Sequence, residues 1–253
     1  MTETTTIIRV SNAWRLFGQE RQDKALAGVS LTVERGEFLC LAGPSGSGKT
    51  TLLNLMGMLD LPSDGQVEIL GREGRGLNLR QRAILRRRHL GFIFQAYNLI
   101  PVLSVAENVE YPLILAGQGK AERSRLVEQA LALVGIAEHG AKRPGELSGG
   151  QQQRAAVARA IAGTPPIILA DEPTGSLDSR TGAALMDLLQ GLNRELGITF
   201  VFSSHDPNVI KRAGRIVVLR DGQIAGDWRA AADAAGKEAF IREFLSGQQE
   251  DRG

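Results

Sequence analysis

Gly43-Pro44-Ser45-Gly46-Ser47-Gly48-Lys49-Thr50 is the stretch that decides the fold of this sequence, and it follows the apolar run of residues 38–42. It fits the spacing G-x-x-x-x-G-K-[ST], in which glycines let backbone N–H groups turn toward an anion and a helix N-terminus adds unpaired amides. In that arrangement Lys49 neutralises the outer phosphates and the Thr50 hydroxyl ligates magnesium. The stretch predicts a phosphate cradle between a buried strand and a helix. The alternative is a glycine-rich turn that merely caps the helix.

The composition is that of an ordinary globular protein, with 43% hydrophobic and 23% charged residues among 253. A formal charge of +2 gives no reason to expect bulk binding to nucleic acid or anionic lipid. The single cysteine, Cys40, excludes an internal disulfide and is expected to be a small buried hydrophobe. No apolar run approaches the ~18 residues of a membrane span and the start is polar, so we expect the chain to stay in the cytosol.

Two short strands, residues 7–10 and 29–33, are predicted before the cradle, and they flank a turn at residues 13–18. An aromatic ring in that turn offers a purine a large stacking surface. Phe17 and Trp14 both fit this role, and both fit a place in the core equally well.

The cradle is followed by a predicted helix over residues 50–59, with apolar residues at helical spacing. Its expected buried side consists of Leu52, Leu53, Leu55, Met56 and Leu59. Farther on, residues 79–89 carry five arginines. Such a basic stripe is compatible with phosphates or lipid headgroups, but a solvated helix face near a membrane partner is the commoner explanation, so we assign it no chemistry.

Residues 91–95 are predicted to form a buried strand ending at Gln95, where a parallel sheet presents its ligand-binding edge. Residues 105–144 show helical spacing and no strand pattern, so we expect a helical lobe inserted into an α/β core. Leu147-Ser148-Gly149-Gly150-Gln151 comes next, followed by a helix over residues 152–162. A serine hydroxyl and two glycine amides at a helix N-terminus favour an anion, although no lysine stands beside them.

Paired carboxylates end the apolar run of residues 167–170. A buried strand here would carry Asp171 to the edge of the cradle, where it can hold magnesium, mostly through water. Glu172 would project one residue further and orient or deprotonate an attacking water. Adjacent acids after a strand are common by chance, but beside the Lys49 cradle they predict a catalytic pair.

A further strand, residues 198–202, delivers His205 to the cradle side, where a histidine can sense or polarise a terminal phosphate. We expect a hairpin over residues 216–224 and an amphipathic helix near residues 238–245 of the charged tail. The other two histidines lack such a context and are predicted to be surface residues: His89 and His139.

Together these motifs resemble those of the ATP-binding subunits of ABC transporters, over about residues 7–227. In chain order the matches are residues 43–50 with the Walker A loop, Gln95 with the Q-loop, residues 147–151 with the signature motif, residues 167–172 with the Walker B strand, residues 176–178 with the D-loop and His205 with the switch histidine. Phe17 falls where the family usually has a tyrosine that stacks on adenine, and its ring keeps that role. Ala170 is smaller than the residue the family commonly places there, which we expect to affect packing only.

The resemblance implies an α/β fold with a P-loop RecA-like core, an antiparallel β subdomain and an inserted helical subdomain. Core and β subdomain would occupy residues 1–95 and 163–227, and the helical subdomain about residues 96–162, within one ATPase domain over residues 1–227. The tail would be residues 228–253.

The resemblance also implies a head-to-tail dimer in which Ser148 of one chain closes over the γ-phosphate held by Lys49 of the other. Catalysis is assigned to Glu172 as the base, with His205, Gln95 and Lys49, and Mg²⁺ to Thr50, Gln95 and Asp171. The ATP contacts it implies are Phe17, Gly43, Pro44, Ser45, Gly46, Ser47, Gly48, Lys49, Thr50, Thr51, Gln95, Ser148, Gly149, Gly150, Gln151, Asp178 and His205.

Within the family, residues 90–115 and 171–178 look most like the lipoprotein-releasing and macrolide-exporting branch. The implied partners are a second copy of the chain and an integral membrane permease, with no nucleic acid. The implied location is peripheral, at the cytoplasmic face of the inner membrane.

Two other function classes also use a P-loop. A soluble ABC-type ATPase acting on DNA or ribosomes predicts a long coiled coil between Lys49 and Ser148 or a duplicated cassette, and the sequence contains neither. A P-loop kinase or GTPase leaves residues 147–151 unexplained and requires a phosphate-acceptor or guanine-reading motif, which we do not find.

Overall fold

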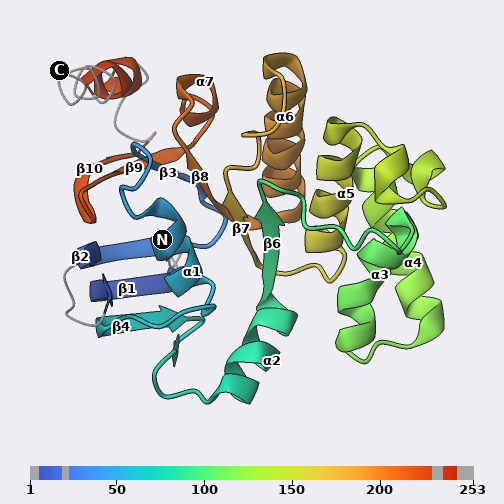
Figure 1. Ribbon diagram of the computed structural model, residues 1–253, viewed down its shortest axis with the longest axis horizontal. Helices are drawn as coiled ribbons and strands as arrows, with labels where there is room; N and C mark the ends of the chain where they lie inside the picture. Colours follow the sequence, from blue (N-terminus) through green and yellow to red (C-terminus); the bar gives the residue numbers. More distant parts are fainter. Residues whose placement is uncertain (1–5, 19–22, 230–235, 244–253) are drawn as a thin grey trace. The chain divides into compact units, whose positions relative to one another are not determined.

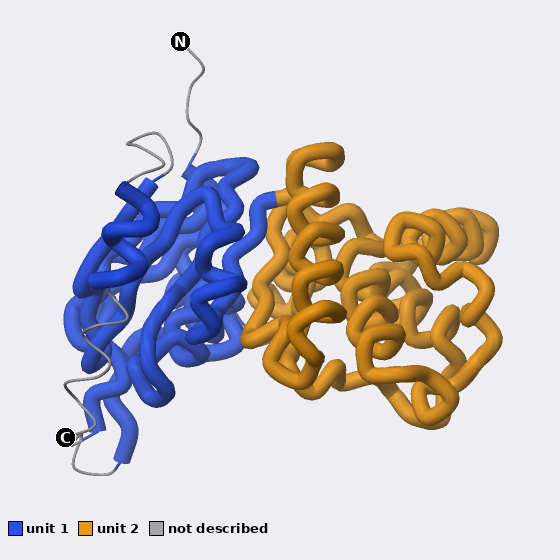
Figure 2. The backbone as a smooth tube through the Cα atoms, turned by 90° about the horizontal axis from the view of Figure 1, so that it is seen from above, with its two compact units in different colours: residues 1–78, 199–253 blue, residues 79–198 orange. Residues whose placement is uncertain are grey.

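The computed structural model describes residues 6–18, 23–229 and 236–243, and the chain divides into two compact units (Figure 2). Unit 1 comprises residues 1–78 and 199–253, and unit 2 comprises residues 79–198. The helical lobe predicted for residues 96–162 falls within unit 2.

A four-stranded antiparallel sheet in unit 1 has the order β2-β1-β4-β5 (Figure 1). Its strands are β1 (Thr6–Phe17), β2 (Asp23–Glu34), β4 (Asp64–Ile69) and β5 (Arg72–Glu73). The prediction of two short strands was wrong in length, because β1 and β2 each run for 12 residues. A register shift beside Asn12, whose φ is 46°, lets β1 continue where a turn was expected.

The other strands of unit 1 are ordered β10-β9-β3-β8, with β3 parallel to both of its neighbours. They are β3 (Phe38–Ala42), β8 (Thr199–Ser204), β9 (Arg215–Arg220) and β10 (Gln223–Arg229). All residues of β3 are buried, as a parallel strand with an unbroken apolar run should be, and Cys40 is buried as predicted. The predicted hairpin is confirmed: Asp221 and Gly222, with φ of 50° and 74°, form the tight turn from β9 to β10.

Helix α1 (Lys49–Met56) contacts β8 and the antiparallel strands β1, β2 and β4. The four apolar residues predicted for its inner side within this range are buried. Leu59 was predicted to join them and does not: the helix ends at its C-cap Gly57, Met58 takes a φ of 49°, and Leu59 is 47% exposed.

Unit 2 contains the parallel pair β6 (Leu90–Phe94) and β7 (Ile167–Asp171). The helices are α2 (Leu79–His89), α3 (Val105–Leu115), α4 (Lys120–Leu133), α5 (Gly149–Ile161) and α6 (Ser179–Leu196), with 3₁₀ turns η1 (Ala137–His139) and η2 (Pro144–Glu146). Helix α5 contacts β6, and α3, α4 and α6 contact α5. The segment predicted as a helical lobe is helical. Helix α5 begins at Gly149 rather than at residue 152, because Ser148 caps it.

Unit 1 also holds the short helix α7 (Pro207–Ile210) and a helical segment at residues 236–243. The latter confirms part of the predicted tail helix, and Leu245 lies outside the described residues. The Lys237 ammonium donates to the Ala213 carbonyl at 2.6 Å and lies 5.2 Å from the centre of the Trp228 ring. Across the described part of the chain, no helix combines the length and apolarity of a membrane span.

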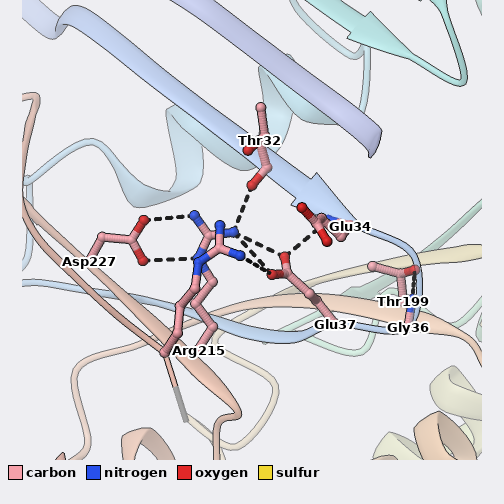
Figure 3. A network of polar contacts seen from close by, with 8 residues as sticks. Thr32, Glu34, Gly36, Glu37, Thr199, Arg215 and Asp227 are labelled. Atoms are coloured by element: carbon pink, nitrogen blue, oxygen red, sulfur yellow. Dashed lines mark hydrogen bonds and ion pairs between the residues drawn. The ribbon is translucent and has the colours of Figure 1, made fainter. Parts of the chain in front are cut away.

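A buried arginine ties the strands of unit 1 together (Figure 3). The guanidinium of Arg215, on β9, pairs with the Asp227 carboxylate of β10 at 2.7 and 2.9 Å. It also donates to the Glu37 carboxylate at 3.0 and 3.2 Å and to the Thr32 carbonyl at 2.7 Å. Burial opposes the charge, but the hydrogen bonds and charges of Asp227 and Glu37 prevail, so the pKa of Arg215 is raised.

We expect Arg215→Ala to lower the free energy of unfolding by about 3 kcal/mol, because it leaves two partly buried carboxylates without their cation. Urea unfolding followed by circular dichroism measures this. Arg229→Ala is the matched control: its side chain is 45% exposed and lies 3.4 Å from the same Glu37. It should cost less than about 1 kcal/mol. Equal losses of unfolding free energy in the two variants would contradict the conclusion that the buried charge of Arg215 stabilises the fold.

Candidate functional site

The cradle in unit 1 has a backbone shape that requires its glycines. Gly48 has a φ of 100°, and a Cβ atom there would collide with the Ala25 carbonyl oxygen. A Cβ atom on Gly43 would collide with the Leu219 carbonyl oxygen. The backbone of the loop is therefore packed against neighbouring strands without room for side chains at these positions.

Helix α1 begins at this loop without a side-chain cap and without an acidic residue in its first turn. By contrast, α3, α5 and α6 are capped by their own Ser104, Ser148 and Asp178. An uncapped N-terminus presents its amides and positive dipole end to an anion. The loop thus has the properties of a phosphate site, which the alternative of a self-capping turn does not explain.

Lys49 supplies the cation of the cradle. Its side chain is buried, and the ammonium donates to the carbonyl oxygens of Gly43 at 2.8 Å and Pro44 at 2.7 Å. The Ser47 hydroxyl is buried and has no hydrogen-bond partner among the residues that the structure describes, while Ser45 and Thr50 are exposed. The loop therefore combines a lysine folded across its carbonyls with a polar atom whose hydrogen bonding is incomplete.

His205 lies at the same edge of the sheet as the cradle. Ala42, the last residue of β3, pairs in parallel register with Ser204, the last residue of β8. Gly43 and His205 are the next residues of the two strands, so the histidine emerges beside the start of the loop. Its side chain is exposed, as a group that meets a ligand requires.

Phe17 ends β1 with 44% of its surface exposed, which excludes the core position left open by the sequence. The Arg15 guanidinium lies 4.6 Å from the centre of its ring and forms an ion pair with Asp60 at 2.7 Å. The arginine covers one part of the ring by a cation–π contact, and the exposed remainder is suited to stacking.

In unit 2 the carboxyl ends of β6 and β7 bring the predicted polar residues together. Phe94 pairs in parallel register with Asp171, so Gln95 and Glu172 follow at the same edge. The Ser176 hydroxyl donates to the Gln95 carbonyl at 3.2 Å. Glu172 has a φ of 46°, an uncommon conformation for a residue with a side chain and one that clusters at functional sites.

The 147–151 motif forms the N-terminus of α5 through a capping box. The Ser148 hydroxyl accepts from the Gln151 N–H at 3.4 Å, and the Gln151 side-chain oxygen accepts from the Ser148 N–H at 2.9 Å. A Cβ atom on Gly149 would approach the Tyr97 hydroxyl to 2.9 Å. One on Gly150 would approach a Thr181 methyl to 2.6 Å. Both glycines are therefore required for this packing.

Asp178, a predicted ATP contact, is the N-cap of α6. Its carboxylate accepts from the N–H groups of Arg180 at 3.1 Å and Thr181 at 3.0 Å. Hydrogen bonds from Thr181, side chain first and then backbone, lower the pKa of Asp178. The residue therefore stays ionised and holds the turn that follows Glu172.

Two residues of α5 that hold the site loops were not predicted from the sequence. Arg159 donates to the carbonyl oxygens of Asn98 at 2.5 Å and Tyr97 at 2.8 Å, and burial lowers its pKa. The Gln153 amide, fully buried, donates to the Pro173 carbonyl at 2.5 Å. One helix thus holds the loops after both Gln95 and Glu172. The sequence signal that could have indicated them is the presence of polar residues inside an otherwise apolar, alanine-rich helix.

The predicted site residues therefore form two groups. Unit 1 brings together the cradle and His205, and also carries Phe17. Unit 2 brings together Gln95, Asp171 and Glu172 at one strand edge, and builds the capped Ser148 motif.

The chain matches the family model for ABC transporters over residues 26–175. The ABC transporter ATP-binding protein MJ1508 of Methanocaldococcus jannaschii, itself uncharacterized, is 45% identical over 219 residues, which cover 86% of this chain and 97% of that protein. The macrolide export ATP-binding/permease protein MacB of Hyphomonas neptunium is 44% identical over 243 residues, which cover 94% of this chain. The chain spans 38% of the length of that MacB protein.

A solved dimeric structure of the ATP-binding cassette MJ0796, in a post-hydrolysis state with ADP and Pi, has a TM-score of 0.81 with this chain at 41% identity. The match covers 88% of this chain and 98% of the cassette. It confirms the predicted fold class, a mixed α/β cassette with an antiparallel β subdomain and a helical subdomain. The chain therefore belongs to the ABC transporter family, as one of its ATP-binding, ATP-hydrolysing subunits.

Proposed function

We propose that this ATPase works as a pair of chains, each presenting its Ser148 motif to the ATP held in the other chain's cradle. The observation that supports the proposal is the presence of two different helix N-termini in one chain, one at Lys49 and one at Ser148. The end at Lys49 is uncapped and carries a cation, whereas the end at Ser148 is capped and has none. Two half-sites of this kind complement each other across a head-to-tail dimer, and the similar cassette MJ0796 was solved as a dimer.

In the proposed reaction Lys49 and the loop amides bind the β- and γ-phosphates, and Phe17 stacks on the base. Glu172 orients the attacking water and takes up its proton. His205 contacts the γ-phosphate while negative charge shifts among its oxygens during transfer. Gln95 orients the attacking water together with Glu172. Positioning and charge neutralisation supply most of the rate in such a site.

The oxygen donors fit Mg²⁺, which prefers hydroxyl, amide and carboxylate oxygens and keeps several waters. We propose Thr50, Gln95 and Asp171 as the residues that hold it. The Thr50 side chain is exposed at the uncapped helix start, and Gln95 and Asp171 share one strand edge. When bound, the ion neutralises phosphate charge.

The partner we propose is a membrane permease of the export or lipoprotein-release type, which would hold the subunit at the cytoplasmic face of the inner membrane. Support comes from MacB, whose name joins the ATP-binding and permease activities in one protein. A formal charge of +2 gives no support for nucleic acid as the partner.

Ser148→Asp tests the shared site. Asp is as good an N-cap as Ser, so the helix keeps its cap while a negative charge is placed before the γ-phosphate. We expect ATP hydrolysis to fall at least about tenfold, since a like charge at the transferring phosphate opposes charge neutralisation. ATP affinity at protein concentrations too low for pairing should stay unchanged, because the motif would serve the other chain's nucleotide.

Ser104→Asp is the matched control. Ser104 caps α3 with the same capping box, its hydroxyl accepting from Glu107 at 3.2 Å. Hydrolysis by this variant should stay normal. Unimpaired hydrolysis by Ser148→Asp, or weaker ATP binding by the unpaired chain, would contradict the two-chain site.

A further inference from the structure

His139 lies against the Ser148 motif, although the sequence predicted it as a surface residue. Its side chain, on η1, is 15% exposed, and its Nε2 atom is 2.8 Å from the side-chain nitrogen of Gln151. We propose that His139 is a positioning residue that orients Ser148 through Gln151 and makes the Ser148 motif sensitive to pH. The inference rests on the proposed role of Ser148 toward ATP.

The hydrogen bonds around Gln151 determine which atom of His139 carries the proton. The Gln151 oxygen accepts from the Ser148 N–H, so the amide nitrogen, which only donates, faces His139. Nε2 must therefore accept, which requires an imidazole without a proton on that atom. The contact exists only with the neutral ring.

The remaining polar contacts of the His139 ring are few among the described residues. Its Nδ1 atom is buried and has no hydrogen-bond partner among the described residues. The charged side chain in contact with the ring is Glu138, whose carboxylate lies 3.6 Å from Nε2 and is 69% exposed. Helix α4 also packs against η1, and the ion pair of the ring among the described residues is the one with Glu138. Gln151 is neutral.

Protonation of His139 would turn Nε2 into a donor that faces the donor of Gln151. The ring would then turn toward the Glu138 carboxylate, or the Gln151 amide would flip. A flip removes the acceptor of the Ser148 N–H, and a turned ring frees Gln151 to move. Either change breaks the capping box that orients the Ser148 hydroxyl.

The test compares His139→Ala with His139→Gln in the full chain, at pH 8 and pH 6. The Gln side chain carries an oxygen about as far from the backbone as Nε2, and that oxygen accepts a hydrogen bond but does not titrate. Hydrolysis is measured directly. ATP-driven pairing is measured in the Glu172→Gln background by size exclusion with light scattering.

At pH 8 we expect His139→Ala to lower pairing and hydrolysis about fivefold, the factor equivalent to the roughly 1 kcal/mol that a helix cap contributes to stability, and His139→Gln to match the unmodified chain. At pH 6 the unmodified chain should fall toward the Ala variant while His139→Gln holds its level. His205 is present in all three proteins, so the difference between their pH profiles belongs to residue 139. Glu138→Gln, as the control, should be normal at pH 8.

Thermal unfolding shows whether each variant is folded. If His139→Ala is not folded, comparing the pH profile of His139→Gln with that of the unmodified chain still tests the inference. Identical profiles for His139→Gln and the unmodified chain would overturn the inference. If Glu172→Gln with His139 intact shows no ATP-driven pairing, the proposed function fails, and the inference fails with it.

Discussion

Glu172→Gln is expected to keep ATP bound while hydrolysis falls by about 10²–10⁴-fold, the usual contribution of a general base. The amide keeps the shape of the side chain but cannot take up a proton from water. Because Glu172 lies at the strand edge beside Gln95 and not in the Lys49 loop, its loss should leave nucleotide affinity nearly unchanged. ATP should therefore hold chains together, and a paired form should accumulate.

Phosphate release and light scattering with ATP or ADP measure the two effects. Glu195→Gln is a matched control, since Glu195 is an exposed glutamate near the end of α6. It should hydrolyse ATP at the normal rate. Turnover by Glu172→Gln within tenfold of normal would reject Glu172 as the base. If hydrolysis is lost but no pair forms, the role of Glu172 as the base stands and the two-chain site is rejected.

Lys49→Ala is expected to weaken ATP binding by on the order of a hundredfold, because charge-assisted hydrogen bonds to phosphate contribute about 1.5–3 kcal/mol. The substitution also leaves the Gly43 and Pro44 carbonyls without the ammonium that now bridges them. Titration with a fluorescent ATP analogue measures the affinity. The predicted loss is larger for ATP than for adenosine, since the base does not contact Lys49.

Lys142→Ala provides the comparison, as an exposed lysine in unit 2 whose loss removes the same formal charge. ATP affinity should be unaffected by it. Lys49→Arg should not restore full binding, because the planar guanidinium is larger than the ammonium that fits the loop. Unchanged ATP affinity in Lys49→Ala would mean that the loop is not the phosphate site.

Much of the candidate site could be predicted because its signals are local. The glycines and lysine of residues 43–50, the buried strand before them and the presence of a helix shortly after Ser148 each depend on a few consecutive residues. Asp171 and Gln95 were placed correctly at strand ends because an apolar run followed by a polar residue marks the edge of a parallel sheet.

The predictions that failed depend on contacts between distant residues. The length of β1 is decided by its pairing with β2 and β4 across a bulge, and Leu59 is exposed because the chain turns at Met58. His139 was assigned to the surface because nothing beside it in the sequence marks a partner. Its partner, Gln151, comes from another element.

The sequence by itself determined the family, the cradle and the identity of the polar residues at the strand ends, since these depend on spacing within single segments. The tertiary structure alone decided how those segments are held: Arg159 on the carbonyls of residues 97 and 98, His139 on the capping box, and Arg215 between Glu37 and Asp227. A side chain finds a hydrogen-bond partner in space, and only folding brings residues 178 positions apart, such as Arg215 and Glu37, within bonding distance.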